Sequence, residues 1–149
     1  MTTAQTRIGF IGGGNMAYAI VGGLLQAGHS AACVHVSDPS EAQLQRFEEL
    51  NPGIATGGDN AATLAAAEVL VLAVKPQLIE DVLGPLSDAE RPDGQLVMSI
   101  AAGVTLKSLS RLLAPTRSIV RVMPNQPALV GAGMSVLTAT TETTREQRD

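Results

Sequence analysis

The feature that most constrains this chain is a glycine-rich loop between a short apolar run and a helical pattern. Ile8–Ile11 has the composition of a short buried strand. Helical periodicity runs from about Asn15 to Ala27, and Gly28 ends it. The loop between them reads Gly12-Gly13-Gly14-Asn15-Met16-Ala17. A strand, a tight turn and a helix in this order are typical of the start of a β-α-β unit.

Apolar runs and helical patterns alternate along the rest of the chain. Helices are predicted from Ser40 to Leu50, from Asn60 to Ala67, from Pro76 to near Gly84, and around the Leu106, Leu109, Leu112 and Leu113 stripe. Further strands are predicted at Ala32–Ser37, Ile54–Thr56, Val69–Val74, Leu96–Ile100, Ser118–Met123 and Met134–Leu137. This alternation favours an α/β fold of the Rossmann type, a doubly wound, mostly parallel sheet with helices on both faces.

Length and composition exclude several classes of protein. The 149 residues suffice for about one domain, and 45% hydrophobic with 16% charged residues is a globular balance. With a net charge of −4 and no basic run, a nucleic-acid partner is not expected. No apolar run approaches the ~20 residues that span a membrane, and Cys33 alone forms no internal disulfide, so we expect a reducing cytoplasm. No cluster of side chains has metal-ligand spacing, and no metal site is expected.

The glycine loop has the pattern that binds a diphosphate. Gly12 permits the tight turn, Gly14 lets the backbone approach a pyrophosphate, and Ala17 is small enough for the helix to lie close to the strand. The amino end of the helix adds partial positive charge. The context predicts a dinucleotide cofactor, and the alternative is a glycine-rich turn without a ligand.

The end of the second strand, Ser37-Asp38-Pro39-Ser40, has two interpretations. Asp38 follows Gly14 at about the sequence separation expected for an acid that binds the ribose of the cofactor. A carboxylate there favours NAD and repels the 2′-phosphate of NADP. The hydroxyls of Ser37 and Ser40 would instead reach that phosphate. In the alternative, Asp38 and Pro39 only form a turn and Ser40 only caps the next helix.

Three more segments follow predicted strands, at the edge of the sheet where ligands bind in open α/β folds. Lys75, in Ala73-Val74-Lys75-Pro76, would hold a phosphate, a ribose or a substrate carboxylate, unless it is simply an exposed lysine at a helix entry. Small residues from Ser99 to Thr105 leave room for a flat ring. In the Met123–Ala128 loop, Asn125 would hydrogen-bond the nicotinamide carboxamide or the substrate, and the alternative is a proline-rich loop without a role in binding.

Together these segments resemble the pyrroline-5-carboxylate reductases, from Ile8 to about Val136. The most specific pieces are Ile8–Ala17, Ala73–Pro76, Ser99–Thr105 and Arg121–Val130. The resemblance implies reduction of 1-pyrroline-5-carboxylate to proline, the last step of proline biosynthesis, by hydride from a nicotinamide cofactor. NADPH is the implied cofactor, with NAD as the alternative because Asp38 stands where the family often has a hydroxyl residue.

The resemblance also implies which residues contact the cofactor and how the protein is organised. Residues 1–140 would form the cofactor domain, and 141–149 the start of a linker helix, capped by Thr144 and Gln147, to a missing helical domain. That domain would build a homo-oligomer, and no catalytic residue is assigned to this chain. With Asn125 added from the loop argument, the expected cofactor contacts are Ile11, Gly12, Gly13, Gly14, Asn15, Met16, Ser37, Asp38, Asn60, Ala73, Val74, Lys75, Pro76, Ala101, Ala102 and Asn125.

Two other functions fit the same first domain. One is another two-domain dehydrogenase, of the β-hydroxyacid or deazaflavin-dependent NADP reductase type. The other is a nucleotide-binding module without catalysis.

Overall fold

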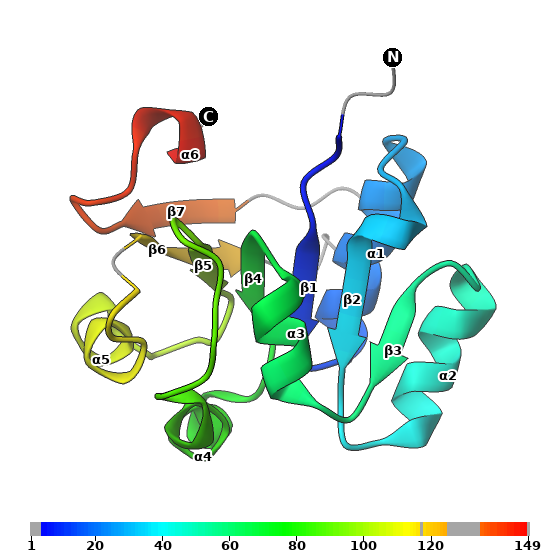
Figure 1. The fold of residues 1–149 in the computed structure, drawn as a ribbon, viewed down its shortest axis with the longest axis horizontal. Coiled ribbons are helices and arrows are strands. Elements are labelled where there is room, and N and C mark those ends of the chain that lie inside the picture. The colour runs from blue at the N-terminus through cyan, green and yellow to red at the C-terminus, as the bar shows by residue number, and fades with distance from the viewer. Residues whose placement is uncertain (1–3, 117, 125–134, 149) are drawn as a thin grey trace.

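A computed structural model describes residues 4–116, 118–124 and 135–148 of the chain. Within these residues, a seven-stranded sheet has the order β3-β2-β1-β4-β5-β6-β7 (Figure 1). The strands are β1 (Ile8–Ile11), β2 (Val34–Ser37), β3 (Ala55–Gly57), β4 (Val69–Leu72), β5 (Leu96–Ser99), β6 (Ser118–Pro124) and β7 (Ser135–Ala139). All neighbours pair in parallel except β6 and β7, which are antiparallel. The predicted doubly wound, mostly parallel sheet is confirmed.

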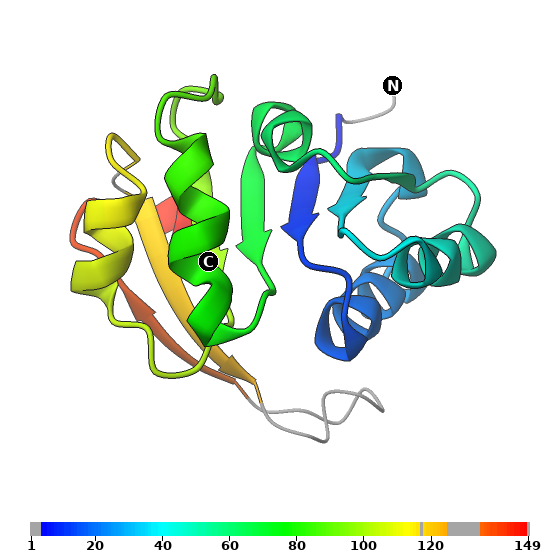
Figure 2. The ribbon, with the colours of Figure 1, turned by 90° about the horizontal axis from the view of Figure 1, so that it is seen from below.

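Helices cover both faces of this sheet. They are α1 (Asn15–Gln26), α2 (Glu41–Leu50), α3 (Asn60–Ala66), α4 (Ile79–Leu83), α5 (Leu106–Leu112) and α6 (Arg145–Arg148). Figure 2 shows α1 and α2, in blue to cyan, on one side and α3 to α5, in green to yellow, on the other. The buried cores follow this division. Phe10, Val21 and Phe47 belong to the cluster under α1 and α2, whereas Leu64, Leu83 and Leu109 belong to the cluster under α3 to α5.

Several predicted elements differ from the structure by a residue or two at their ends; β4, for example, ends at Leu72 rather than Val74, and two predicted elements include 3-10 turns. The second strand begins at Val34 rather than Ala32, because Ala31–Cys33 form a 3-10 turn in which the Cys33 N–H donates to the Ser30 carbonyl. The helix expected from Pro76 is divided into a 3-10 turn (Pro76–Leu78), α4, and a second 3-10 turn (Gly84–Leu86). Pro85 lacks the N–H that would continue α4.

Gly9 in β1 allows α3 to pack closely against the centre of the sheet. A Cβ atom added to Gly9 in β1 would lie 2.8 Å from Ala67 Cβ and 2.9 Å from Thr63 Cγ2. A larger residue at this position would force α3 away from β1. Because α3 begins at the edge that carries the glycine loop, this packing also fixes where Asn60 lies.

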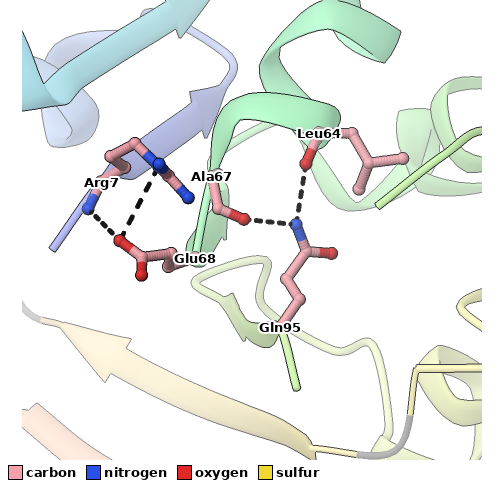
Figure 3. A network of polar contacts seen from close by, with 5 residues as sticks. All are labelled: Arg7, Leu64, Ala67, Glu68 and Gln95. Atoms are coloured by element: carbon pink, nitrogen blue, oxygen red, sulfur yellow. Dashed lines mark hydrogen bonds and ion pairs between the residues drawn. The ribbon is translucent and has the colours of Figure 1, made fainter. Parts of the chain in front are cut away.

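The opposite, amino edge of the sheet is held by a polar network (Figure 3). Gln95 is 4% exposed, and its Nε2 donates to the carbonyls of Leu64 and Ala67 at 2.8 Å each. These carbonyls belong to the last turn of α3 and the residue that follows it. Nearby, the Arg7 backbone N–H donates to Glu68 Oε2 at 2.9 Å. The network ties the α3–β4 connection to the residues just before β1 and β5.

One part of the sheet is bordered by only the four-residue helix α6 among the described residues. A third apolar cluster consists of Leu96, Val120 and Val122 with partly buried neighbours that all come from the strands or the residue after them. Beside it is a hollow of about 470 Å³, lined by Leu96, Met98, Val120, Leu137, Ala139, Gln147 and Arg148. Leu137 on β7 is 59% exposed. We call this surface, formed by the residues that line the hollow, the open β5–β7 face.

The last turn of the chain lies at the rim of the open β5–β7 face. Thr144 Oγ1 accepts from the Gln147 N–H at 3.2 Å, and Gln147 Oε1 accepts from the Thr144 N–H at 3.0 Å. The predicted capping box is therefore confirmed. Among the helices of the described residues, none is long and apolar enough to cross a membrane.

Candidate cofactor site

The predicted site lies where the winding of the sheet changes direction. From β1 the chain passes outward to β2 and β3, and it then crosses to β4 and continues to β5 and β6 on the other side. The loops after β1 and β4 leave the lower edge of the sheet in Figure 1, at the carboxyl ends of adjacent parallel strands. In open α/β sheets, ligands bind in the crevice at such a switch point.

The structure brings three of the predicted segments into contact: the glycine loop, the end of β2 and the segment after β4. The Ala73 N–H donates to the Ile11 carbonyl at 2.8 Å, and the Gly12 N–H donates to the Ser37 carbonyl at 2.8 Å. Gly12 has φ = +103°, and a Cβ atom added there would lie 2.5 Å from the Ala73 carbonyl oxygen. The turn therefore requires glycine for both its conformation and its packing. This confirms the tight turn expected at Gly12.

Gly14 and the amino end of α1 are open. Gly14 is the N-cap, with an extended conformation (φ = −79°), and among the described residues no side chain accepts from the first-turn amides of α1. By contrast, Ser40, Asp59, Thr105 and Thr144 cap α2, α3, α5 and α6 with their own side chains. An added Cβ at Gly14 would meet no atom within 4 Å. The first turn of α1 therefore keeps donors and positive potential for an anion.

Asp38 braces the loop rather than standing free. Its Oδ2 accepts from the Gly13 N–H and its Oδ1 from the Ser40 N–H, each at 2.8 Å. The Ser40 hydroxyl caps α2 by accepting from the Gln43 N–H at 3.4 Å. The turn at Asp38 and the cap at Ser40 are therefore both present. The remaining lone pairs of the carboxylate are still able to accept from a ribose, so that role stays a prediction.

Ser37 faces inward, which corrects one expectation. Its side chain is 1% exposed, and its hydroxyl donates to Asn60 Oδ1 at 2.7 Å. The hydroxyl is therefore directed toward Asn60 and not toward the surface, where the expected contact with a phosphate would be made. Asn60 is not the cap of α3, because Asp59 accepts from the Ala61 and Ala62 N–H groups. With Oδ1 taken, Asn60 keeps its amino group for donation.

The other predicted residues lie at the same edge. Lys75 is exposed at the start of the 3-10 turn after β4, and no described carboxylate pairs with it. Ala101 is 4% exposed and Ala102 is exposed, directly after β5. Asn125 lies outside the described residues.

Sequence reasoning missed Arg46. Its Nη1 donates to Asn15 Oδ1 at 3.1 Å and to Gln43 Oε1 at 2.8 Å, and its Cζ lies 4.5 Å from the centroid of the Tyr18 ring. Arg46 thus connects α2 to the first turn of α1. No arginine follows Asp38 directly in the sequence, and Arg46 lies in the second turn of α2. Its helical spacing from Gln43 was the available signal.

Comparison with known proteins agrees with this geometry. Residues 7–103 match the family model described as NADP oxidoreductase coenzyme F420-dependent. The chain belongs to this family. The matched span runs from β1 through β5 and includes the glycine loop, Asp38, Asn60 and the loop after β4.

Proteins similar to this chain include pyrroline-5-carboxylate reductases. The chain is 47% identical over 141 residues to the pyrroline-5-carboxylate reductase of Haemophilus influenzae, which covers 95% of the chain and 51% of the relative. A structure of a pyrroline-5-carboxylate reductase from Coxiella burnetii has a TM-score of 0.91 at 39% identity, over 97% of this chain and 53% of that one. The resemblance found in the sequence is confirmed. The chain spans about half the length of the curated relatives it matches.

A more distant structure shares the fold. The pyrroline carboxylate reductase of Plasmodium falciparum, solved with NADP bound, has a TM-score of 0.81 at 24% identity, over 97% of this chain and 52% of that one.

Proposed function

We propose that this chain is the cofactor-binding part of a pyrroline-5-carboxylate reductase and that it binds NADPH. The observation that carries the proposal is the uncapped amino end of α1, the longest helix of the described residues, directly after a glycine loop at the switch point of the sheet. The family description and the names of the relatives support the same function.

The residues at the carboxyl edge have separate tasks in this proposal. Amides of Gly14, Asn15 and Met16 bind the diphosphate, because no side chain of the described residues accepts from them. The Asn60 amino group donates to the adenosine side, and Lys75 steadies a ribose or phosphate. Ala101 and Ala102 leave space for the flat ring beside the end of β5. Bound NADPH supplies the hydride that reduces the C=N bond of 1-pyrroline-5-carboxylate.

We favour NADPH over NADH, although Asp38 carries a negative charge at this corner. Two backbone amides already donate to its carboxylate, which offsets part of that charge. The matching family is described as an NADP oxidoreductase, and the Plasmodium reductase was solved with NADP bound. Binding of NADPH and NADH is therefore measured side by side in the experiment that follows.

Gly14→Ala tests the proposed diphosphate site. Gly14 has a backbone conformation that alanine adopts, and the added Cβ meets no protein atom, so the variant should melt within a few degrees of the wild type. The Cβ would stand where the diphosphate must approach. We expect the Kd for NADPH, measured by calorimetry, to rise by about tenfold or more, as loss of roughly 1.4 kcal/mol implies.

Gly23→Ala is the matched control. Gly23 also has open space around it, but it lies in the interior of α1 away from the loop. This variant should bind NADPH as the wild type does and gain a little stability. Equal NADPH affinity in Gly14→Ala and the wild type would refute the proposed site.

The reaction is tested on the protein that carries this chain. Oxidation of NADPH on addition of 1-pyrroline-5-carboxylate, with proline as the product, supports the reductase. Turnover of a β-hydroxyacid instead would replace it with the other dehydrogenase type. Binding of NADPH without turnover of either substrate would favour the non-catalytic module.

A further inference from the structure

The guanidinium of Arg46 lies beside the proposed cofactor site and has no carboxylate partner among the described residues. The two ion pairs found there, Arg7 with Glu68 and Arg111 with Glu80, are elsewhere. Acidic groups near Arg46 in the sequence are engaged differently. Glu48 accepts from the Thr56 hydroxyl at 2.6 Å, and Glu49 accepts from Gln45 at 3.0 Å.

The described groups that Arg46 hydrogen-bonds or stacks on are neutral. One guanidinium nitrogen, Nη1, donates to the side-chain oxygens of Asn15 and Gln43, and the guanidinium carbon lies over the Tyr18 ring. Tyr18 itself packs edge-on against Phe47, with ring centroids 5.5 Å apart. Arg46 is therefore positioned by α1 and α2 together, while its charge is left uncompensated.

Donors of Arg46 remain available. Among the described residues, no group accepts a hydrogen bond from Nε or Nη2 of Arg46. Neither atom is buried without a hydrogen-bond partner. Both atoms are thus in contact with solvent. A fixed guanidinium with two free donor atoms matches the oxygens of a phosphate group.

The position of Arg46 indicates which phosphate it meets. Asn15 opens α1, and Gln43 lies in the first turn of α2, whose cap Ser40 follows the end of β2 by three residues. In dinucleotide-binding domains the 2′-phosphate of NADP lies beyond the end of this strand, where an arginine nearby accommodates it. Arg46 approaches that place from the second turn of α2.

We propose that Arg46 binds the 2′-phosphate of NADPH and makes this chain select NADPH over NADH. The inference rests on the proposed function and deepens it. It explains how a chain with Asp38 at the ribose corner still accepts a phosphorylated ribose: the Gly13 and Ser40 amides offset the charge of Asp38, and Arg46 supplies the positive charge.

Arg46→Gln tests this role, with Arg111→Gln as the matched control. Arg111 is an exposed arginine on α5, paired with Glu80 at 3.3 Å, and lies outside the site. In Arg46→Gln we expect the Kd for NADPH to rise about tenfold or more, as for the loss of a charge-assisted hydrogen bond, and the Kd for NADH to stay within about twofold. Arg111→Gln should change neither value. The NADPH preference of the wild type should also weaken as salt is raised.

Arg46→Lys distinguishes an effect of the lost charge on NADPH affinity from an effect of the substitution on folding. It keeps the positive charge and the stem, so its NADPH affinity should fall between those of the wild type and Arg46→Gln. If Arg46→Gln does not fold, the comparison of Arg46→Lys with the wild type decides the matter. An unchanged ratio of NADPH to NADH affinity in Arg46→Lys then counts against the inference, because a single point charge does not replace a forked donor.

The outcomes distinguish this inference from the proposed function. Equal losses for NADPH and NADH would assign Arg46 to the diphosphate and overturn the 2′-phosphate role. Unchanged affinities for both would overturn it as well. If the wild type binds neither nucleotide, the proposed function itself fails, and the inference fails with it.

Discussion

Two glycines of one loop have opposite structural requirements. Gly12 has a positive φ and touches the Ala73 carbonyl, whereas Gly14 is extended and borders open space. From the sequence both were predicted to be needed, Gly12 for the turn and Gly14 for the ligand, and the structure separates the two reasons. A substitution at each position therefore reports on a different property of the molecule.

Gly12→Ala should lower the free energy of unfolding. The new Cβ would lie 2.5 Å from the Ala73 carbonyl oxygen in a backbone conformation that alanine avoids. We expect a loss of at least about 1–3 kcal/mol, the usual cost of such a conformation. Urea unfolding followed by circular dichroism measures it. A variant as stable as Gly14→Ala would contradict the role given to the turn.

Ser37→Ala should weaken cofactor binding although Ser37 is buried. Without the hydroxyl, Asn60 loses the donor that fixes its side-chain oxygen, and its amino group is no longer held for donation. We expect the Kd for NADPH to rise a few-fold, since a neutral hydrogen bond contributes about 1 kcal/mol. In an Asn60→Ala background the same substitution should have little further effect. A full additional loss there would show that Ser37 acts independently of Asn60.

The sequence located this corner but not the direction of its side chains. Ser37 and Asp38 were expected to meet a ligand directly, yet the partners of both are distant in sequence: Asn60 for Ser37, and Gly13 for Asp38. Arg46 shows the same limit, because its contacts depend on how α2 packs against α1. Local pattern determines which residues lie at a strand end, whereas tertiary packing determines which of them remain free.

At the scale of elements, strand and helix order was predictable because periodicity and caps are local. Ser40 and Thr144 cap the helices at the predicted places. The 3-10 turns around α4 and before β2 were not foreseen, since a turn of three residues has too little periodicity to recognise. The role of Gln95 was also missed, because its partners are the carbonyls of Leu64 and Ala67.

Gln95→Met should destabilise the fold without touching the proposed site. The substitution keeps the side-chain length but leaves the two carbonyls at the end of α3 without their donor. We expect the free energy of unfolding to fall by about 1–3 kcal/mol, measured by thermal or urea denaturation. Gln45→Met is the control, since Gln45 is exposed and donates only to Glu49 on its own helix. Similar stabilities for the two variants would contradict the role of Gln95.

At the scale of the whole molecule, the open β5–β7 face is a surface where apolar side chains remain exposed. Among the described residues, the only helix that lines the hollow beside the cluster of Leu96, Val120 and Val122 is the short α6, and Leu137 is 59% exposed. Sequence pattern alone does not show which strands are left uncovered, since strand order is a property of the complete sheet.

We predict that residues 1–149 expressed alone self-associate through this face. Contiguous apolar surface drives association in water. Sedimentation at increasing concentration should show species larger than the monomer, and Leu137→Lys should shift them toward the monomer. Leu78→Lys is the control, because Leu78 is also exposed, at 44%, but lies at the turn before α4. A wild-type chain that stays monomeric at high concentration would disprove the prediction.

The brace formed by Asp38 has a kinetic consequence for the nucleotide. Since the carboxylate joins the glycine turn to the start of α2 in the free chain, the turn has its binding shape before any ligand arrives. Encounter then requires no folding step, so the association rate should increase linearly with nucleotide concentration and show no plateau. The Gly13 amide should likewise exchange slowly with deuterium even in the apo protein.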